Sequence, residues 1–187
     1  MDEIRLKLWH RVVGWMALAI EVPTRWWLGG AVALQRDAKR LRTLVERVNR
    51  GSSALGRGRW FVTDGLAAYV TVIKAVFREP VPTGQPGRPP LIPWPRLPIG
   101  PVVKRYVGGK LEGIERRLVP GSAEMIETLR HKAAGAGVLN TAFIERFNGT
   151  RRGHIAALSS SHPRLGRSLH QLALGYVPDR NGLQFLL

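Results

Sequence analysis

The sequence predicts a mixed α/β fold in which an antiparallel three-strand meander precedes parallel strands, with helices flanking the sheet. Three observations support this prediction: an alternating apolar segment at the start of the chain, two apolar runs after it, and a change to helical spacing from residue 36 onward. Of the 187 residues, 44% are hydrophobic, which is enough to bury the core of one domain.

The first three apolar segments have the patterns of strands. From Ile4 to Leu8, apolar and basic residues alternate, as in a strand with one covered face. Apolar runs follow at Gly14 to Val22 and Trp26 to Leu34, with Pro23 between them. Tight connections of this kind predict an antiparallel meander. Asp2 shares the parity of the apolar positions and is therefore expected on the covered face, which is an unusual place for a carboxylate.

The chain then changes its hydrophobic period. Apolar spacing predicts a basic helix from Arg36 to Arg50 and a second helix from Leu66 to Phe77. Between them, Trp60 to Thr63 has the composition of a short buried strand, which Asp64 and Gly65 close. Strand, helix and strand in this order predict a right-handed crossover and a partly parallel sheet.

The second half of the chain contains more loop signals. Nine prolines fall between Pro80 and Pro101, so an extended surface loop is expected over residues 80–101. A hairpin is expected around Gly108-Gly109, and a short helix is expected after Ser122. A last helix is predicted from Thr141 to about Leu158, and beyond it the regular pattern weakens.

The composition is strongly basic. Lys and Arg number 29 against 13 Asp and Glu, so the formal net charge is +16. Such a surface favours polyanionic partners, with nucleic acid first and an anionic membrane second. The absence of cysteine excludes disulfides, Cys-ligated metal sites and thiol catalysis. Charged residues and Pro23 interrupt the longest apolar stretch, so no membrane span is expected and a cytoplasmic protein is predicted.

Three carboxylates occupy unusual settings. Asp2 lies on the apolar face of the first strand, and Asp64 ends a buried strand where open α/β sheets place ligand-binding residues. Glu145 lies in a helix between two phenylalanines. Buried carboxylates are costly, and a divalent metal offsets that cost. Each also has an ordinary explanation: a frayed terminal residue, a turn or N-cap residue, and an ion-pair partner of a nearby arginine, respectively.

The order of these carboxylates is that of a known family. The segments Asp2-Glu3-Ile4-Arg5, Phe61-Val62-Thr63-Asp64-Gly65 and Asn140-Thr141-Ala142-Phe143-Ile144-Glu145-Arg146-Phe147-Asn148 resemble the catalytic core of bacterial insertion-sequence transposases. These belong to the ribonuclease H/retroviral integrase superfamily with an Asp-Asp-Glu triad. The resemblance implies a ribonuclease H-like, mixed five-stranded sheet over residues 1–158, followed by an irregular or degraded tail over 159–187. It assigns Asp2, Asp64 and Glu145 as catalytic, metal-binding carboxylates.

The resemblance also implies chemistry and partners. Two Mg²⁺ or Mn²⁺ ions would bind between the carboxylates and the scissile phosphate during DNA cleavage and strand transfer at insertion-sequence ends. The partners would be transposon ends and target DNA, with a homo-oligomer by analogy and a nucleoid-associated location. Family members usually carry a DNA-binding module before the first aspartate, so the alternative is an inactive, truncated remnant that only binds nucleic acid. An RNA-binding or ribosome-associated protein would explain the charge but not the buried acids.

Basic residues are expected to neutralise DNA phosphates without reading sequence. The candidates lie on the first helix, after the proline-rich loop and beside the third carboxylate: Lys39, Arg40, Lys104, Arg105, Arg146, Arg151 and Arg152. The alternative for such residues is a solvated face without a partner. Trp94, inside the proline-rich loop, is the one tryptophan expected to contact a partner, and the others are expected in the core.

Overall fold

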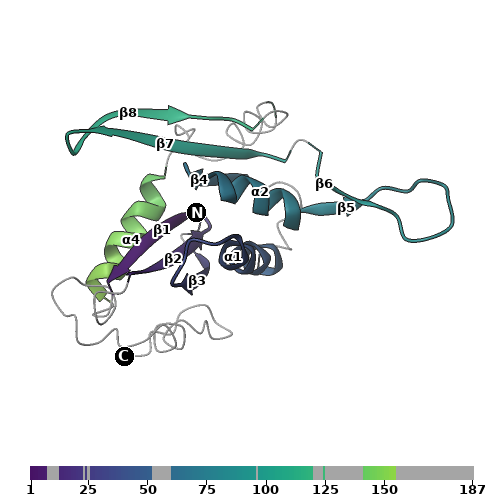
Figure 1. The fold of residues 1–187 in the computed structure, drawn as a ribbon, viewed down its shortest axis with the longest axis horizontal. Coiled ribbons are helices and arrows are strands. Elements are labelled where there is room, and N and C mark those ends of the chain that lie inside the picture. The colour runs from purple at the N-terminus through teal and green to yellow at the C-terminus, as the bar shows by residue number, and fades with distance from the viewer. Residues whose placement is uncertain are drawn as a thin grey trace. The chain divides into compact units, whose positions relative to one another are not determined.

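The computed structural model describes residues 1–7, 13–22, 24, 26–51, 60–95, 97–119, 124 and 141–154, with side chains as far as residue 150. Over these residues the fold is mixed α/β, with three helices and with sheets of antiparallel and mixed strands (Figure 1). None of the described helices has the length and apolarity needed to cross a membrane. The helix expected after Ser122, apart from Glu124, and the tail expected over 159–187 lie outside the described residues.

The chain forms two compact units. The first combines Met1–Val48 with Thr141–Leu187, and the second is Asn49–Asn140. In the first unit, β1 (Asp2–Lys7), β2 (Val13–Ile20) and β3 (Trp27–Ala33) pair antiparallel in the order β1-β2-β3. The predicted meander is therefore confirmed.

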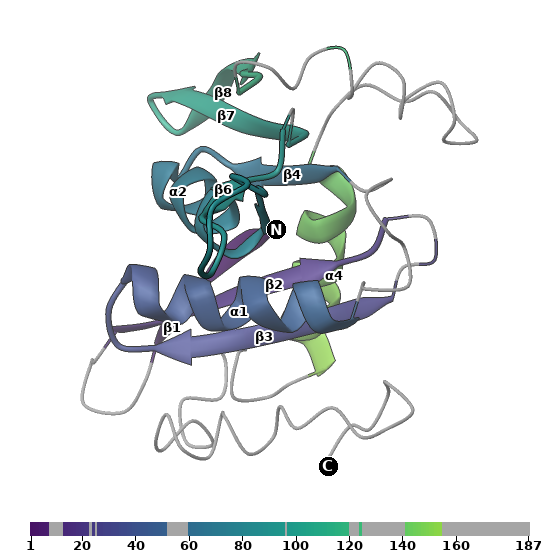
Figure 2. The same ribbon diagram turned by 90° about the vertical axis from the view of Figure 1, so that its right-hand side faces the viewer.

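The meander of the first unit carries a helix on each face (Figure 2). On one face, Ile144 of α4 (Ala142–His154) packs into a cluster with buried residues of β1 and β2, namely Ile4, Leu6, Met16 and Leu18. On the other face lies α1 (Ala38–Gly51), close enough that a Cβ added at Gly29 would be 3.6 Å from the Arg47 Cβ. The inner side of α1 buries the residues that predicted it: Leu41, Leu44, Val45 and Val48.

The second unit begins with the predicted strand and helix, β4 (Phe61–Asp64) and α2 (Ala67–Val76). β4 pairs parallel with β7 (Ile99–Val107), and β7 pairs antiparallel with β8 (Lys110–Arg116). A partly parallel sheet was predicted, and β4 with β7 is a parallel pair. The predicted crossover through the basic helix is not shown, because β3 and β4 belong to different sheets, and the described strands do not form a single five-stranded sheet. The β7–β8 hairpin is confirmed.

The turn of this hairpin explains its two glycines. Gly108 and Gly109 have φ values of 56° and 79°, in the left-handed region that side chains with a Cβ avoid.

The expected loop over residues 80–101 contains regular structure. β5 (Arg78–Pro80) pairs antiparallel with β6 (Leu91–Pro93), and the last three residues of the range belong to β7. Trp94, which follows β6, is half-buried, and its ring contacts Phe77 edge-on at 5.1 Å between centroids. Phe77 in turn lies 4.7 Å from the Phe61 ring. Trp94 is thus part of an aromatic cluster within the second unit.

Candidate active site

Asp2 lies at the start of β1, on the face that α4 covers. Its Oδ2 accepts a hydrogen bond from Asn148 Nδ2 at 2.7 Å, and its Oδ1 accepts one from the Glu3 backbone N–H at 2.8 Å. The contact with Asn148 joins residues 146 positions apart in the chain. Two of the three sequence motifs therefore meet within the first unit, at a half-buried carboxylate.

Glu145 lies in the first turn of α4 and is half-buried. Its Oε1 accepts a hydrogen bond from the Thr141 hydroxyl, and its backbone N–H donates to the Thr141 carbonyl at 3.0 Å. The partial positive charge at a helix N-terminus favours a carboxylate at this position. Residues 141, 145 and 148 follow helical spacing, so Thr141, Glu145 and Asn148 share one side of α4.

Asp2 and Glu145 interact electrostatically. Burial raises the pKa of Asp2, and the nearby negative charge of Glu145 raises it further. The hydrogen bond from the Glu3 N–H, the positive charge of the Met1 amino group and the hydrogen bond from the Asn148 amide lower the pKa without cancelling the rise. The fold therefore holds two carboxylates under mutual repulsion in a partly desolvated place, and a divalent cation would relieve this repulsion.

The oxygen atoms at this place suit a hard cation. Asn148 is 3% exposed, and its buried Oδ1 has no hydrogen-bond partner within the part of the chain that the structure describes. Carboxylate and amide oxygens are the ligands that Mg²⁺ and Mn²⁺ prefer. Asp2, Glu145 and Asn148 thus fit a divalent ion in chemical type, although the described residues contain no group of three His, Asp or Glu that could hold one.

Asp64, the remaining predicted carboxylate, belongs to the second unit. It is the last residue of β4, is half-buried, and its Oδ1 accepts the Leu66 N–H at 3.2 Å, so it has the turn role that was its ordinary alternative. Beside it, Thr63 is fully buried, and its hydroxyl has no hydrogen-bond partner among the described residues. A Cβ at Gly65 would lie 3.0 Å from Val103 Cγ2, so the turn after Asp64 passes very close to β7. The convergence of Asp64 with Asp2 and Glu145 stays a prediction.

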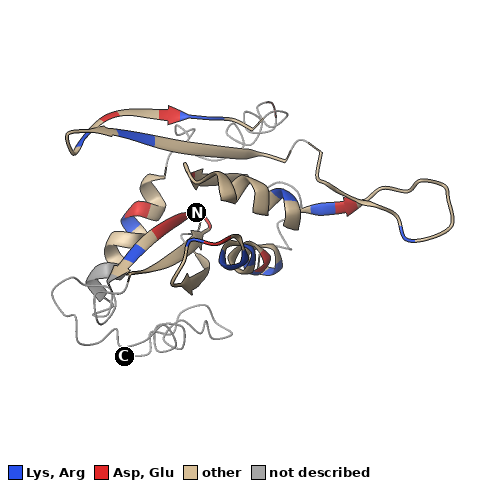
Figure 3. Cartoon of the chain, viewed as in Figure 1, with Lys and Arg blue, Asp and Glu red and all other residues tan. Residues whose placement is uncertain are grey.

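The cations expected to contact DNA differ in exposure. Lys39, Arg105 and Arg146 are exposed and Lys104 is half-buried; they lie on α1, β7 and α4, where Figure 3 shows basic residues. The side chains of Arg151 and Arg152 lie outside the described residues, although both positions belong to α4.

Arg40 is not on the solvated face of its helix. Its guanidinium forms an ion pair with the Glu3 carboxylate, and both side chains are only 2% exposed. Arg36 also donates to Glu3, through Nε at 2.7 Å. Glu3 has the parity of the basic residues of β1, and its side chain is buried between two arginines because α1 covers that face.

Asn148 is the residue of this site that sequence reasoning did not select. Its helical spacing could have predicted this place, because Asn148 comes three positions after Glu145 and four after Ile144, on the side of α4 that contacts the sheet. The chain matches no protein-family model, no curated protein and no solved structure. The functional assignment therefore depends on the residues of this chain.

Proposed function

We propose that this chain is the catalytic domain of a DNA transposase of the Asp-Asp-Glu type, which cleaves and joins phosphodiester bonds with Mg²⁺ or Mn²⁺. The observation that supports this most directly is the hydrogen bond from Asn148 to Asp2. It brings the helix of the third motif, with Glu145, against the carboxylate of the first motif. The unfavourable environment of the Asp2 charge adds to this support, because a metal would compensate it.

The order of elements supports the ribonuclease H-like fold that this function needs. The meander is followed by a helix, then by β4, which runs parallel to β7. β1 and β4 are each edge strands of their own sheets. The proposed triad further requires Asp64 to converge with Asp2 and Glu145.

The protein side chains would position the catalytic carboxylates and would not themselves attack the phosphate. Bound divalent ions would supply the charge that stabilises the leaving oxygen and activates water or a DNA 3′-hydroxyl. Asn148 donates to Asp2 Oδ2 and so fixes the orientation of that carboxylate. Thr141 does the same for Glu145 Oε1. Because water or the DNA hydroxyl is the nucleophile, no protein nucleophile is required, which agrees with a chain without cysteine.

Isothermal titration with Mn²⁺ tests the metal site. The variants are Asp2→Asn and Asp64→Asn, with Glu112→Gln as the matched control, because Glu112 is an exposed carboxylate on β8. We expect saturable binding by the wild type, a loss of at least about tenfold in affinity for both aspartate variants, and no change for the control. Unchanged binding in Asp64→Asn would contradict the triad, and unchanged binding in both would remove the catalytic proposal.

The exposed cations also fit a second candidate, a basic binding module that holds nucleic acid without catalysis. Lys39, Arg105 and Arg146 would contact phosphates in either case, so DNA binding that weakens steeply with salt is expected for both candidates. Cleavage of labelled DNA ends in the presence of Mn²⁺ separates the two. Cleavage that Asp2→Asn abolishes supports the transposase, whereas salt-dependent binding without cleavage favours the binding module. Sedimentation with paired DNA ends tests the proposed homo-oligomer.

A further inference from the structure

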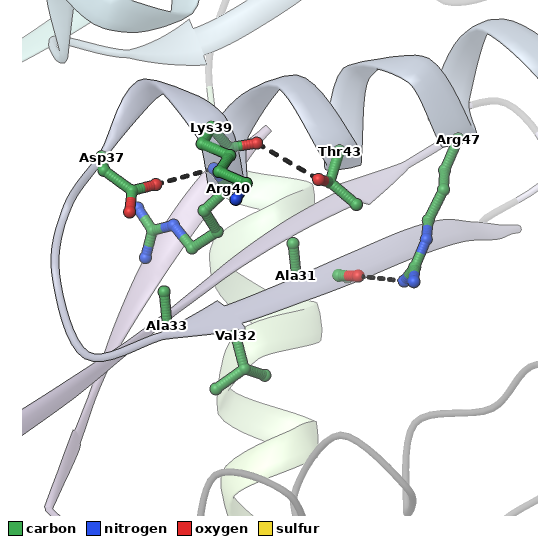
Figure 4. Close-up of a pocket in the computed structure, with 9 residues that line it drawn as sticks. Ala31, Val32, Ala33, Asp37, Lys39, Arg40, Thr43 and Arg47 are labelled. Atoms are coloured by element: carbon green, nitrogen blue, oxygen red, sulfur yellow. Dashed lines mark hydrogen bonds between the residues drawn. The ribbon is translucent and has the colours of Figure 1, made fainter.

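A pocket of about 310 Å³ lies between α1 and β3 in the first unit (Figure 4). Ala31 and Ala33 point from the strand toward the helix, whereas Val32 points away and packs on the α4 side of the sheet. Because alanine side chains fill little space, the strand and the helix leave a cavity that larger residues would close. Its volume lies at the lower end of the range for small-molecule sites.

The helix wall of this pocket is basic. Lys39, Arg40 and Arg47 line it from α1, with Asp37 as the one carboxylate among the lining residues. Asp37 Oδ1 accepts the Arg40 backbone N–H at 2.7 Å, so this carboxylate serves the start of the helix. Arg47 reaches down to the strand and donates to the Gly30 carbonyl at 2.6 Å. The pocket therefore has an excess of positive charge at its helix wall.

Arg40 is the residue that points to a ligand. The whole residue is 5% exposed and its Nη2 pairs with Glu3, yet its buried Nε and Nη1 have no hydrogen-bond partner among the described residues. Buried donors without partners are costly, more so when they belong to a charged group. Glu3 also pairs with Arg36, so one carboxylate serves two guanidiniums and does not neutralise both.

We propose that this pocket binds a phosphate group. A phosphate presents several oxygens to a planar guanidinium, which is the geometry that arginine recognises best. Lys39 and Arg47 would add positive charge to that of Arg40. This chemistry is shared by a small phosphate ester and by a phosphodiester of the DNA backbone. The pocket and the Asp2 site use opposite faces of the meander, so the inference goes beyond the proposed function and does not depend on it.

Titration of the full-length chain with inorganic phosphate at constant ionic strength tests the pocket, with binding followed by calorimetry. We expect saturable binding by the wild type. Arg40→Lys keeps a cation for Glu3 but removes the guanidinium fork, and should weaken binding about tenfold or more. Ala33→Leu should weaken it comparably by filling the cavity without changing any charge. Arg42→Gln is the matched control, because Arg42 is a 59% exposed cation on the same helix, outside the pocket lining.

Circular dichroism establishes that each variant is folded, and Ala33→Leu keeps the test decisive if Arg40→Lys unfolds. The proposal is overturned if the wild type shows no saturable binding, or if Arg42→Gln weakens binding as much as the two pocket variants do. Adding duplex DNA distinguishes the two possible ligands. If DNA displaces the bound phosphate, the ligand of the pocket is a DNA phosphodiester; if DNA binds without displacing it, the ligand is a small phosphate ester. Asp2→Asn should bind phosphate as the wild type does, so failure of the metal site and failure of this pocket give different results.

Discussion

Replacement of Ile144 by alanine tests how firmly α4 is held against the sheet. Ile144 is 4% exposed and packs with the apolar residues of β1 and β2. The substitution removes roughly three buried carbons at about 0.8 kcal/mol each, or about 2.4 kcal/mol in total. The cavity left behind raises the expected loss in the free energy of unfolding to about 3–4 kcal/mol. Ile144→Val removes a single carbon and should cost about 1 kcal/mol.

Urea unfolding at neutral pH, followed by circular dichroism, measures these losses. The comparison is valid when the slope of the free energy of unfolding against urea concentration is the same in the variants and the wild type. Phe143→Ala is the matched control, because Phe143 is the preceding residue of the same helix and is 37% exposed. It should change stability by less than about 1 kcal/mol. If Ile144→Ala costs no more than Phe143→Ala, α4 does not pack against the meander as described. The proximity of Glu145 to Asp2 would then lose its structural basis.

Three further predictions concern charge and backbone geometry. Burial raises the pKa of Asp2 above its ordinary value of 3.8, so the wild type loses stability as the pH rises from 3.8 through the raised pKa. Asp2→Asn should therefore become more stable relative to the wild type over this range, and a difference in urea midpoint that does not change with pH would contradict this. Glu3→Gln leaves the buried Arg40 guanidinium without its carboxylate and should cost about 3–5 kcal/mol in urea unfolding; a cost below about 1 kcal/mol would mean that the pair is not desolvated. At Gly108, with φ of 56°, substitution by valine should cost about 1–2 kcal/mol and by asparagine much less; equal thermal midpoints for the two variants would refute the strained turn.

Local periodicity was sufficient to predict most elements of the first unit. The alternation from Ile4 to Leu8 predicted β1, and the apolar spacing within Arg36 to Arg50 predicted α1, because each pattern reflects one covered side. The same patterns could not predict that both faces of the meander are covered. Glu3 shares the parity of the basic residues Arg5 and Lys7, yet α1 buries its side chain with that of Arg40. Burial of this kind depends on a contact between segments 37 residues apart, which local spacing does not encode.

The β5–β6 pair was missed for a different physical reason. Proline has no N–H to donate, so proline-rich segments are predicted as loops. Pro80 pairs with Leu91 and Pro93 with Arg78, both in a two-stranded sheet in which each strand is an edge. A strand in such a pair needs donors on one side only, so proline is tolerated there. A high proline content therefore does not distinguish a loop from an isolated edge strand.

The two adjacent carboxylates of β1 show how strand alternation separates structural from functional roles. Glu3 points to α1 and meets the guanidiniums of Arg36 and Arg40, which stabilise its charge inside the fold. Asp2 points to α4, where burial raises its pKa and the like charge of Glu145 adds a smaller rise. In the proposed function, a divalent cation would compensate the disfavoured charge of Asp2. Neutralising Asp2 should therefore leave folding intact and remove Mn²⁺ binding, whereas neutralising Glu3 should weaken folding and leave the metal affinity of the folded fraction unchanged.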